Sequence, residues 1–167
     1  MKLYIVRHAI AVPRGSPLIN DSERMLTEEG TVKMEQIAAA LCRLNYKPGF
    51  ILSSPFARAR QTAEILLHAF GKEPEMKILP ALAPSGTRQE LYHAISSIFK
   101  KQIPGLMIVG HQPSLGEIAG EIAFGSSENY IELKKGGVCV IEIESLWGTP
   151  RGTLTALLSP SILRRVR

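Results

Sequence analysis

The sequence predicts a single α/β domain of three layers, in which a mostly parallel central sheet has helices on both faces. Short apolar, β-branched runs alternate with segments of helical periodicity along most of the chain, as in parallel α/β folds. Two strand-like segments follow each other near the C-terminus with no helix between them, which predicts some antiparallel pairing there. The 167 residues, 45% of them hydrophobic, fit one domain with a sizeable core. We therefore expect residues 1–167 to form one domain.

The elements follow in chain order. A short apolar run at 3–6 predicts the first strand, and residues 27–44 carry apolar side chains at spacings of three and four. Thr27 is a suitable N-cap for this helix, and the acids Glu28 and Glu29 suit the dipole of its first turn. The same two patterns predict strands at 50–53, 76–79, 106–109, 138–143 and 153–158, and helices at 55–69, 87–100 and 113–124.

Composition and charge exclude several classes of protein. No apolar run approaches the ~20 residues of a membrane helix, and the run at 3–6 is too short for a signal peptide because Arg7-His8 ends it. We therefore expect a cytoplasmic protein without membrane association. Lys and Arg number 20 against 15 Asp and Glu, and the net charge of +5 favours anionic partners. Phosphorylated small molecules, phosphorylated proteins and nucleic acid all meet that description.

Two of the expected strands end at a histidine. Arg7-His8 follows the first strand, and Gly110-His111 follows the strand at 106–109. Ligands of open α/β sheets bind at the carboxyl ends of the strands. Both imidazoles therefore face one crevice if these two strands are neighbours in the sheet.

A third segment brings further polar groups to the same end of the sheet. Residues 53–62 leave the second strand and begin a helix, which puts Arg58 and Ser54 near the rim of the crevice. Each residue also has a structural explanation when taken alone, because a histidine at a strand end or an arginine early in a helix is often only hydrogen-bonded or solvated. The combination of two histidines and two arginines at one edge is much more specific.

Imidazole and guanidinium groups together suit a phosphoryl group. Arginine offers a planar fork that matches phosphate oxygens in pairs, and a neutral imidazole is a competent nucleophile. Nearby positive charge favours that neutral form. This chemistry needs no metal and no cofactor, and the four histidines and the distant Cys42 and Cys139 show no zinc-ligand spacing.

Three segments in this order resemble the histidine phosphatase superfamily: LYIVRHA at 3–9, SSPFARARQTA at 53–63 and VGHQPS at 109–114. The chain is most similar to the short SixA-like branch of phosphohistidine phosphatases, which its length and the segment at 21–30 also suit. The resemblance covers nearly the whole chain and is least specific after about residue 125.

The resemblance implies a role for each matching residue. His8 is the nucleophile that becomes phosphorylated, Arg7 and Arg58 bind the phosphoryl oxygens, and His111 donates a hydrogen bond to the phosphoryl group in the transition state. Arg24 lies in a matching stretch, where substrate contact and a structural salt bridge are equally supported.

Two departures from the family pattern bear on activity. The family usually has Gly after the nucleophilic histidine, whereas this chain has Ala9, which is strained only if that position needs a positive φ or very close packing. We expect the site to tolerate it.

The second departure concerns the leaving group. Many larger members have an acid just after the third strand, but residues 79–84 contain none. An alkoxide leaving group benefits from a proton donor, whereas an imidazole leaves with little help. The missing acid therefore favours phosphohistidine as substrate, unless folding brings Glu117, Glu90 or Glu28 to the site.

The sequence thus predicts a phosphatase that works through phospho-His8 on the phosphohistidine of a protein partner, with a small phosphorylated metabolite as the main alternative. A phosphoglycerate-type mutase is less well supported, because 167 residues leave little chain for a lid over the site. A non-catalytic module that binds phospho-ligands or nucleic acid draws support from the basic C-terminus at 163–167. Both histidines and both pocket arginines argue against it, and an aromatic content of 6% makes nucleic-acid binding the weaker part of that alternative.

Overall fold

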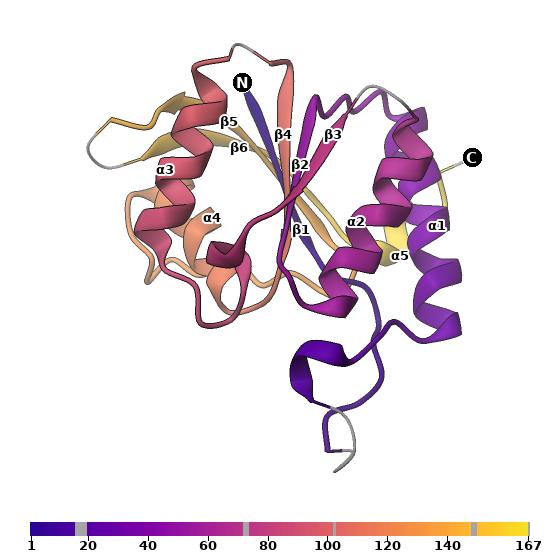
Figure 1. Ribbon diagram of the computed structural model, residues 1–167. Helices are drawn as coiled ribbons and strands as arrows, with labels where there is room; N and C mark the ends of the chain where they lie inside the picture. Colours follow the sequence, from indigo (N-terminus) through magenta and orange to yellow (C-terminus); the bar gives the residue numbers. More distant parts are fainter. Residues whose placement is uncertain (16–19, 72–73, 102, 148–149, 167) are drawn as a thin grey trace.

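The computed structural model describes residues 1–15, 20–71, 74–101, 103–147 and 150–166. Arg167, the last residue of the basic C-terminus, lies outside these ranges. Within them, one mixed sheet has the strand order β3-β2-β4-β1-β5-β6 (Figure 1). Its strands are β1 (Lys2–Arg7), β2 (Phe50–Ser53), β3 (Glu75–Ile78), β4 (Gly105–Gly110), β5 (Val138–Ser145) and β6 (Arg151–Leu158).

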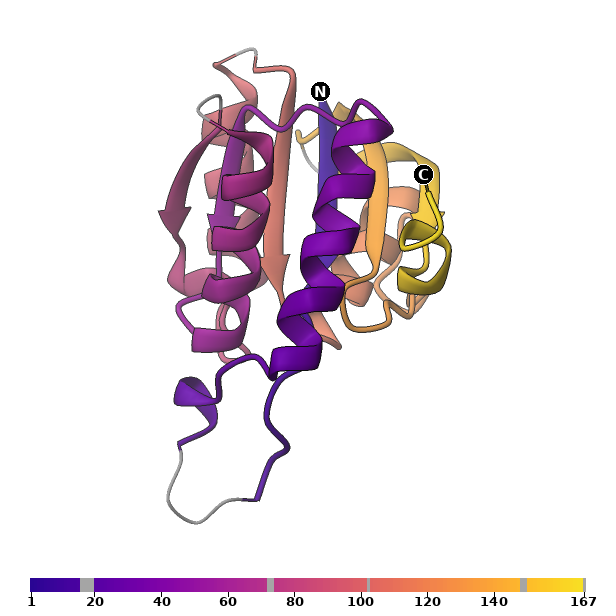
Figure 2. The ribbon, with the colours of Figure 1, turned by 90° about the vertical axis from the view of Figure 1, so that its right-hand side faces the viewer.

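Helices cover both faces of the sheet. They are α1 (Glu28–Arg43), α2 (Ala57–Phe70), α3 (Arg88–Phe99), α4 (Ser114–Phe124) and α5 (Pro160–Leu163), with short 3₁₀ turns η1 (Asp21–Glu23) and η2 (Pro80–Leu82). Figures 1 and 2 show α1, α2 and α5 on one face of the sheet and α3 and α4 on the other. The expected three-layer α/β class is confirmed, including the antiparallel pairing of β5 with β1 and β6.

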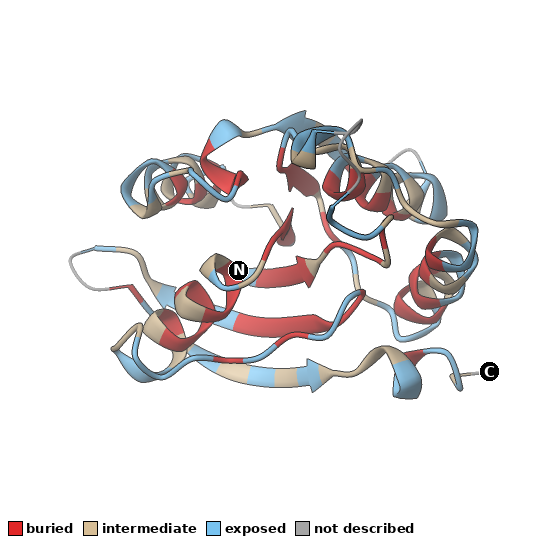
Figure 3. Ribbon diagram, turned by 90° about the horizontal axis from the view of Figure 1, so that it is seen from below, coloured by how far each residue is buried: buried red, intermediate tan, exposed pale blue. Residues whose placement is uncertain are grey.

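The sheet separates two apolar cores, because alternate side chains of its strands point to opposite faces. Along β1, Leu3 and Ile5 join the core beneath α3 and α4, whereas Tyr4 and Val6 join the core beneath α1, α2 and α5. Figure 3 shows the buried residues concentrated on the central strands and on the inner sides of the helices. No helix in the described part of the chain is long and apolar enough to cross a membrane.

All ten elements expected from the sequence are present, with small changes at their ends. Thr27 caps α1 as expected, since its side chain accepts a hydrogen bond from the Gly30 amide at 3.0 Å. The helix expected at 55–69 begins later, at Ala57, because the Phe56 amide donates to the Ser54 hydroxyl in a preceding turn. The turns η1 and η2 and the helix α5 were not expected.

The strand order brings the two histidines together. β1 and β4 are parallel neighbours, and Arg7 is paired with Gly110 in their register. The residues that follow, His8 and His111, therefore leave the sheet side by side at its carboxyl edge. The described residues between β1 and α1, η1 among them, extend beyond that same edge (Figure 1).

Candidate active site

Five of the six residues singled out from the sequence line one cavity of about 430 Å³ at the carboxyl edge of the sheet. The centroids of the His8 and His111 rings are 5.1 Å apart, and both side chains are buried. The lining residues are Arg7, His8, Pro13, Arg14, Arg24, Arg58, Pro84, His111, Gln112, Pro113 and Lys135. Ser54 is not among them.

The contacts of His8 determine which ring nitrogen carries the proton. Its Nδ1 lies 2.7 Å from the main-chain oxygen of Ala9, and a carbonyl oxygen can only accept a hydrogen bond. Nδ1 is therefore the protonated nitrogen. The lone pair of Nε2 then accepts a hydrogen bond from Nε of Arg58, at 3.2 Å. His8 is thus held with the lone pair of Nε2 directed toward Arg58, which also lines the cavity.

His111 is oriented from behind by Ser54. Its Nε2 lies 2.8 Å from the Ser54 hydroxyl, which also accepts a hydrogen bond from the Phe56 amide. A buried hydroxyl needs an acceptor for its own proton, and Nε2 is the one that these contacts provide. The proton of His111 then sits on Nδ1, which is buried without a partner in the described structure. Ser54 therefore acts on the site through His111, which presents an N–H donor.

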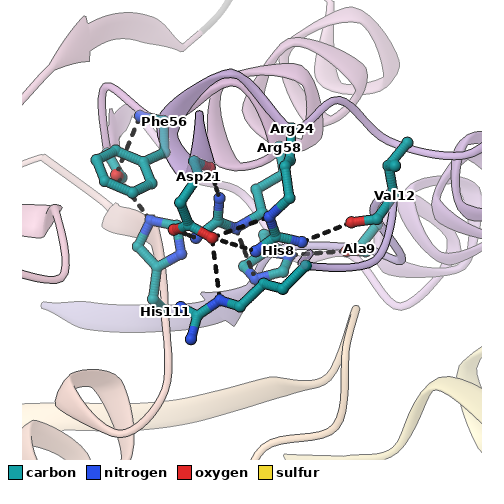
Figure 4. A network of polar contacts seen from close by, with 10 residues as sticks. His8, Ala9, Val12, Asp21, Arg24, Phe56, Arg58 and His111 are labelled. Carbon is teal, nitrogen blue, oxygen red and sulfur yellow. Dashed lines mark hydrogen bonds and ion pairs between the residues drawn. The ribbon is translucent and has the colours of Figure 1, made fainter. Parts of the chain in front are cut away.

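Arg58 connects His8 to the segment that follows β1. It is 1% exposed, and besides His8 it donates to Asp21, from Nη1 to the main-chain oxygen at 2.6 Å and from Nη2 to the carboxylate at 3.1 Å. Arg24 contacts the same carboxylate at 2.8 Å and the main-chain oxygen of Val12 at 2.6 Å. Figure 4 shows this network around His8. Arg24 thus makes the structural salt bridge considered above and also lines the cavity.

Asp21 and Lys135 are site residues that the sequence reasoning missed. Asp21 lies in η1, and the only signal for it was the spacing Asp-x-x-Arg within the segment at 21–30. Lys135 lies in a tight turn before β5, where Lys-Lys-Gly-Gly reads as an ordinary exposed turn. Nothing in the local sequence shows that this turn packs against the end of β1.

The fifth cavity residue, Arg7, is held by a main-chain oxygen. Its Nη1 donates to the Leu133 oxygen at 2.6 Å, while its Nε is buried without a partner in the described structure. A buried guanidinium nitrogen without an acceptor is costly, and an anion in the cavity would supply one.

Burial controls the protonation states in the cavity. It lowers the pKa of His8 to about 4, assisted by the positive charges of Arg58, Arg7 and Lys135. Burial, with His8 and Arg58 nearby, also lowers the pKa of His111 to about 3. Burial alone would raise the pKa of Asp21, but its ion pairs with Arg24 and Arg58 lower it to about 2. At neutral pH both imidazoles are therefore neutral and Asp21 is ionised.

None of the three glutamates considered as proton donors lines the cavity. Glu117 binds Arg88 at 3.0 Å, Glu90 accepts a hydrogen bond from the side chain of Thr87 at the start of α3, and Glu28 begins α1. In the described chain no carboxylate lines the cavity wall. The same ranges hold no group of three or more His, Cys, Asp or Glu placed to bind a metal ion.

Ala9 is accommodated without strain. Its φ is not positive, and its amide donates to the Thr62 hydroxyl at 3.0 Å. The position after His8 therefore requires no glycine conformation in this chain.

Neutral imidazoles and guanidinium groups at the carboxyl ends of parallel strands define a protein that handles phosphoryl groups. Comparison with known proteins agrees. The model of the histidine phosphatase superfamily, branch 1, matches residues 3–84, and the chain belongs to that superfamily.

Two sequence relatives match most of the chain. An uncharacterized protein of Picosynechococcus is 39% identical over 139 residues, covering 83% of this chain and 82% of its own. The phosphohistidine phosphatase SixA of Escherichia coli is 25% identical over 127 residues, covering 76% and 77%.

Solved structures of the same fold include enzymes with different substrates. The protein histidine phosphatase SixA in complex with tungstate has a TM-score of 0.84 at 23% identity, over 96% of this chain and 98% of that one. The alpha-ribazole phosphatase of Shigella flexneri has a TM-score of 0.74 at 18% identity, over 96% and 97%. At these identities the likeness concerns the fold, so the site itself must indicate the substrate.

Proposed function

We propose that this protein is a phosphohistidine phosphatase that transfers the phosphoryl group of a histidine-phosphorylated protein to its own His8 and then to water. The reaction needs no metal, because guanidinium groups and His111 neutralise the phosphoryl oxygens. The observation that carries the proposal is the combination of a neutral imidazole at His8 with a cavity whose described lining includes no carboxylic acid.

The first step forms a bond between phosphorus and Nε2 of His8. The Arg58 Nε–H, which occupies the Nε2 lone pair in the free site, moves to a phosphoryl oxygen as that lone pair attacks. The unpartnered Arg7 Nε and His111 Nδ1 provide two further donors for the phosphoryl oxygens. These donors are in position before substrate arrives, which is how electrostatic stabilisation lowers a barrier most effectively.

The bond that breaks joins phosphorus to the leaving nitrogen of the substrate imidazole. The other ring nitrogen of that imidazole takes up a proton from solvent before the bond breaks, so the ring leaves as neutral imidazole. Neutral imidazole is a weak base, with a conjugate acid of pKa near 6.5, and its departure needs no acid from the protein. In the second step water attacks phospho-His8, releases inorganic phosphate and restores the free Nε2.

Asp21 does not replace the missing acid. It is the carboxylate that contacts the pocket arginines, and those ion pairs hold its pKa at about 2, so it carries no proton to donate at neutral pH. An alkoxide leaving group would depart unassisted, at a disadvantage of about 10²–10⁴. A cavity with this lining therefore favours phosphohistidine over simple phosphate esters.

A competition between substrates tests the proposal. A histidine-phosphorylated phosphotransfer domain, free phosphohistidine, p-nitrophenyl phosphate and an alkyl phosphate are compared in the presence of a chelator. We expect kcat/KM on both phosphohistidine substrates to exceed that on the alkyl phosphate by about 10²-fold or more. Equal or faster turnover of the alkyl phosphate would contradict the proposal and favour a small phosphorylated metabolite.

A further inference from the structure

A second basic cavity adjoins the catalytic one. It has a volume of about 530 Å³ and shares two lining residues, Arg7 and Lys135, with the cavity around His8. Lys33, Lys134 and Arg164 add three more positive charges to its lining. No carboxylate of the described chain lines it. Glu29 of α1 pairs with Lys33, and its carboxylate also interacts electrostatically with Arg164.

Lys134 and Lys135 lie in a turn that is hydrogen-bonded to the end of β1 and to His8. The Gly136 amide donates to the main-chain oxygens of Arg7 and His8, at 3.0 and 3.2 Å, and the Arg7 amide donates to Gly137 at 3.1 Å. The Gly137 amide closes the turn on Lys134 at 2.7 Å, and Gly136 has the φ of +77° that a type II turn requires at its third residue. The position of Lys134 and Lys135 relative to His8 is therefore set by the backbone.

The charges of this turn and of the C-terminal helix are available for a partner. Lys134, Lys135 and Arg164 are exposed, and no salt bridge within the described structure engages them. Like charges grouped around a concavity repel one another, and an anion that enters it relieves that repulsion. The second cavity can therefore accept a negative group beside the cavity that contains His8.

We propose that this second cavity binds an acidic side chain, an Asp or Glu that flanks the phosphohistidine in the protein substrate. The inference rests on the proposed function, because it takes the occupant of the first cavity to be a phosphohistidine. Arg7 and Lys135 contact both anions, so the second cavity selects substrates in which an acid accompanies the phosphoryl group. Rim charges of this kind act mainly on recognition and on the rate of association.

Two peptides of equal length test this inference. Both carry one histidine phosphorylated by phosphoramidate, flanked by Asp and Glu in one and by Asn and Gln in the other. We expect wild-type kcat/KM to be about tenfold higher on the acidic peptide, because two or three exposed charge pairs are gained. The double variant Lys134→Glu/Arg164→Glu should lose that preference and keep its activity on free phosphohistidine.

Further variants separate a specific site from a general effect of charge. Lys2→Glu/Lys47→Glu changes the net charge by the same amount near the opposite end of β1. This variant should keep the preference for the acidic peptide. Lys134→Gln/Arg164→Gln, which adds no repulsion, should reduce it. Equal kcat/KM on the two peptides in the wild type, or a preference that survives in both cavity variants, would overturn the inference.

A binding measurement keeps this test independent of the chemistry. Fluorescence anisotropy of the labelled, unphosphorylated acidic peptide should show weaker binding to Lys134→Glu/Arg164→Glu than to Lys2→Glu/Lys47→Glu. If the wild type cleaves p-nitrophenyl phosphate but not free phosphohistidine, the proposed function fails and the anisotropy alone decides on the second cavity. If the two double variants then bind the peptide equally, the second cavity fails as well.

Discussion

His8 and His111 remain neutral because the protein buries both rings beside positive charges. Their pKa values of about 4 and about 3 lie below the ordinary value of 6.5. An uncharged ring is what nucleophilic attack by His8 needs, and the same property couples the site to stability.

We expect the free energy of unfolding to decrease as the pH falls from 6.5 towards 4. In that window the unfolded chain protonates both histidines and the folded chain does not, so stability is fully present above pH 6.5 and is lost below it. The loss is up to about 1.4 kcal/mol per pH unit for each histidine. Asp21 also reduces stability as the pH falls, but in a lower pH range, because its pKa falls from 3.8 to about 2 on folding.

Urea unfolding at a series of pH values measures this slope. His111→Asn should reduce it, whereas His93→Asn, at an exposed position, should leave it unchanged. A wild-type stability that stays flat between pH 6.5 and 4.5 would show that the two rings are not held neutral.

At the level of single residues, the sequence could predict the groups that follow strands but not those that reach the site through tertiary packing. Arg7, His8 and His111 are placed by the ends of β1 and β4, and Arg58 by the start of α2. Asp21 reaches Arg58 from a 3₁₀ turn, and Lys135 reaches the cavity because its turn bonds to β1. The local sequence offers only the Asp-x-x-Arg spacing for Asp21 and no pattern for Lys135.

Among the elements, α1 supports the segment that follows the nucleophile. Gly30 in its first turn faces the main chain of Ile10, and a Cβ at this position would lie 2.0 Å from the Ile10 oxygen. That oxygen also accepts the Thr27 amide at 3.0 Å, so it cannot move without disturbing the helix cap.

Gly30→Ala should therefore destabilise the protein by about 1–3 kcal/mol, although alanine is the better helix former by about 1 kcal/mol. Activity should fall as well, because the displaced main chain of Ile10 lies two residues after His8. Gln36→Ala, on the exposed face of the same helix, serves as the control and should be neutral or slightly stabilising. Urea unfolding and kcat on free phosphohistidine measure both effects, and a stabilised, fully active Gly30→Ala would contradict this packing.

The elements themselves were predictable because periodicity and turn residues are local signals. Their order in the sheet was not, since the pairing of β1 with β4 joins residues about a hundred positions apart. The resemblance to a known family implied that both histidines serve one site, but it did not give the strand order. The four-residue α5 escaped prediction because it is too short to show a period, and it is held by the buried Leu163 against α1.

Across the whole molecule, the fold brings the imidazoles and guanidinium groups to one edge of the sheet, and we propose that the chain around that edge selects the substrate. Relatives of the same fold include a phosphatase of phosphohistidine and one of alpha-ribazole. The present chain combines a net charge of +5 with two adjoining basic cavities and no carboxylate lining either one in its described part. The positive charge suits a substrate with acidic residues beside its phosphoryl group. The absence of a carboxylate suits a phosphohistidine, whose imidazole is easily displaced.

The central claim is that the phosphoryl group passes through His8, and trapping the intermediate tests it most directly. The protein is mixed with excess phosphohistidine substrate, quenched in alkali within milliseconds and digested for mass spectrometry, beside His8→Ala and the exposed-site control His93→Ala. We predict one phosphoryl group on the peptide that contains His8, stable in alkali and lost in acid, in wild type and His93→Ala only. Turnover that persists in His8→Ala, with no phosphoryl group on the wild-type peptide, would contradict the account.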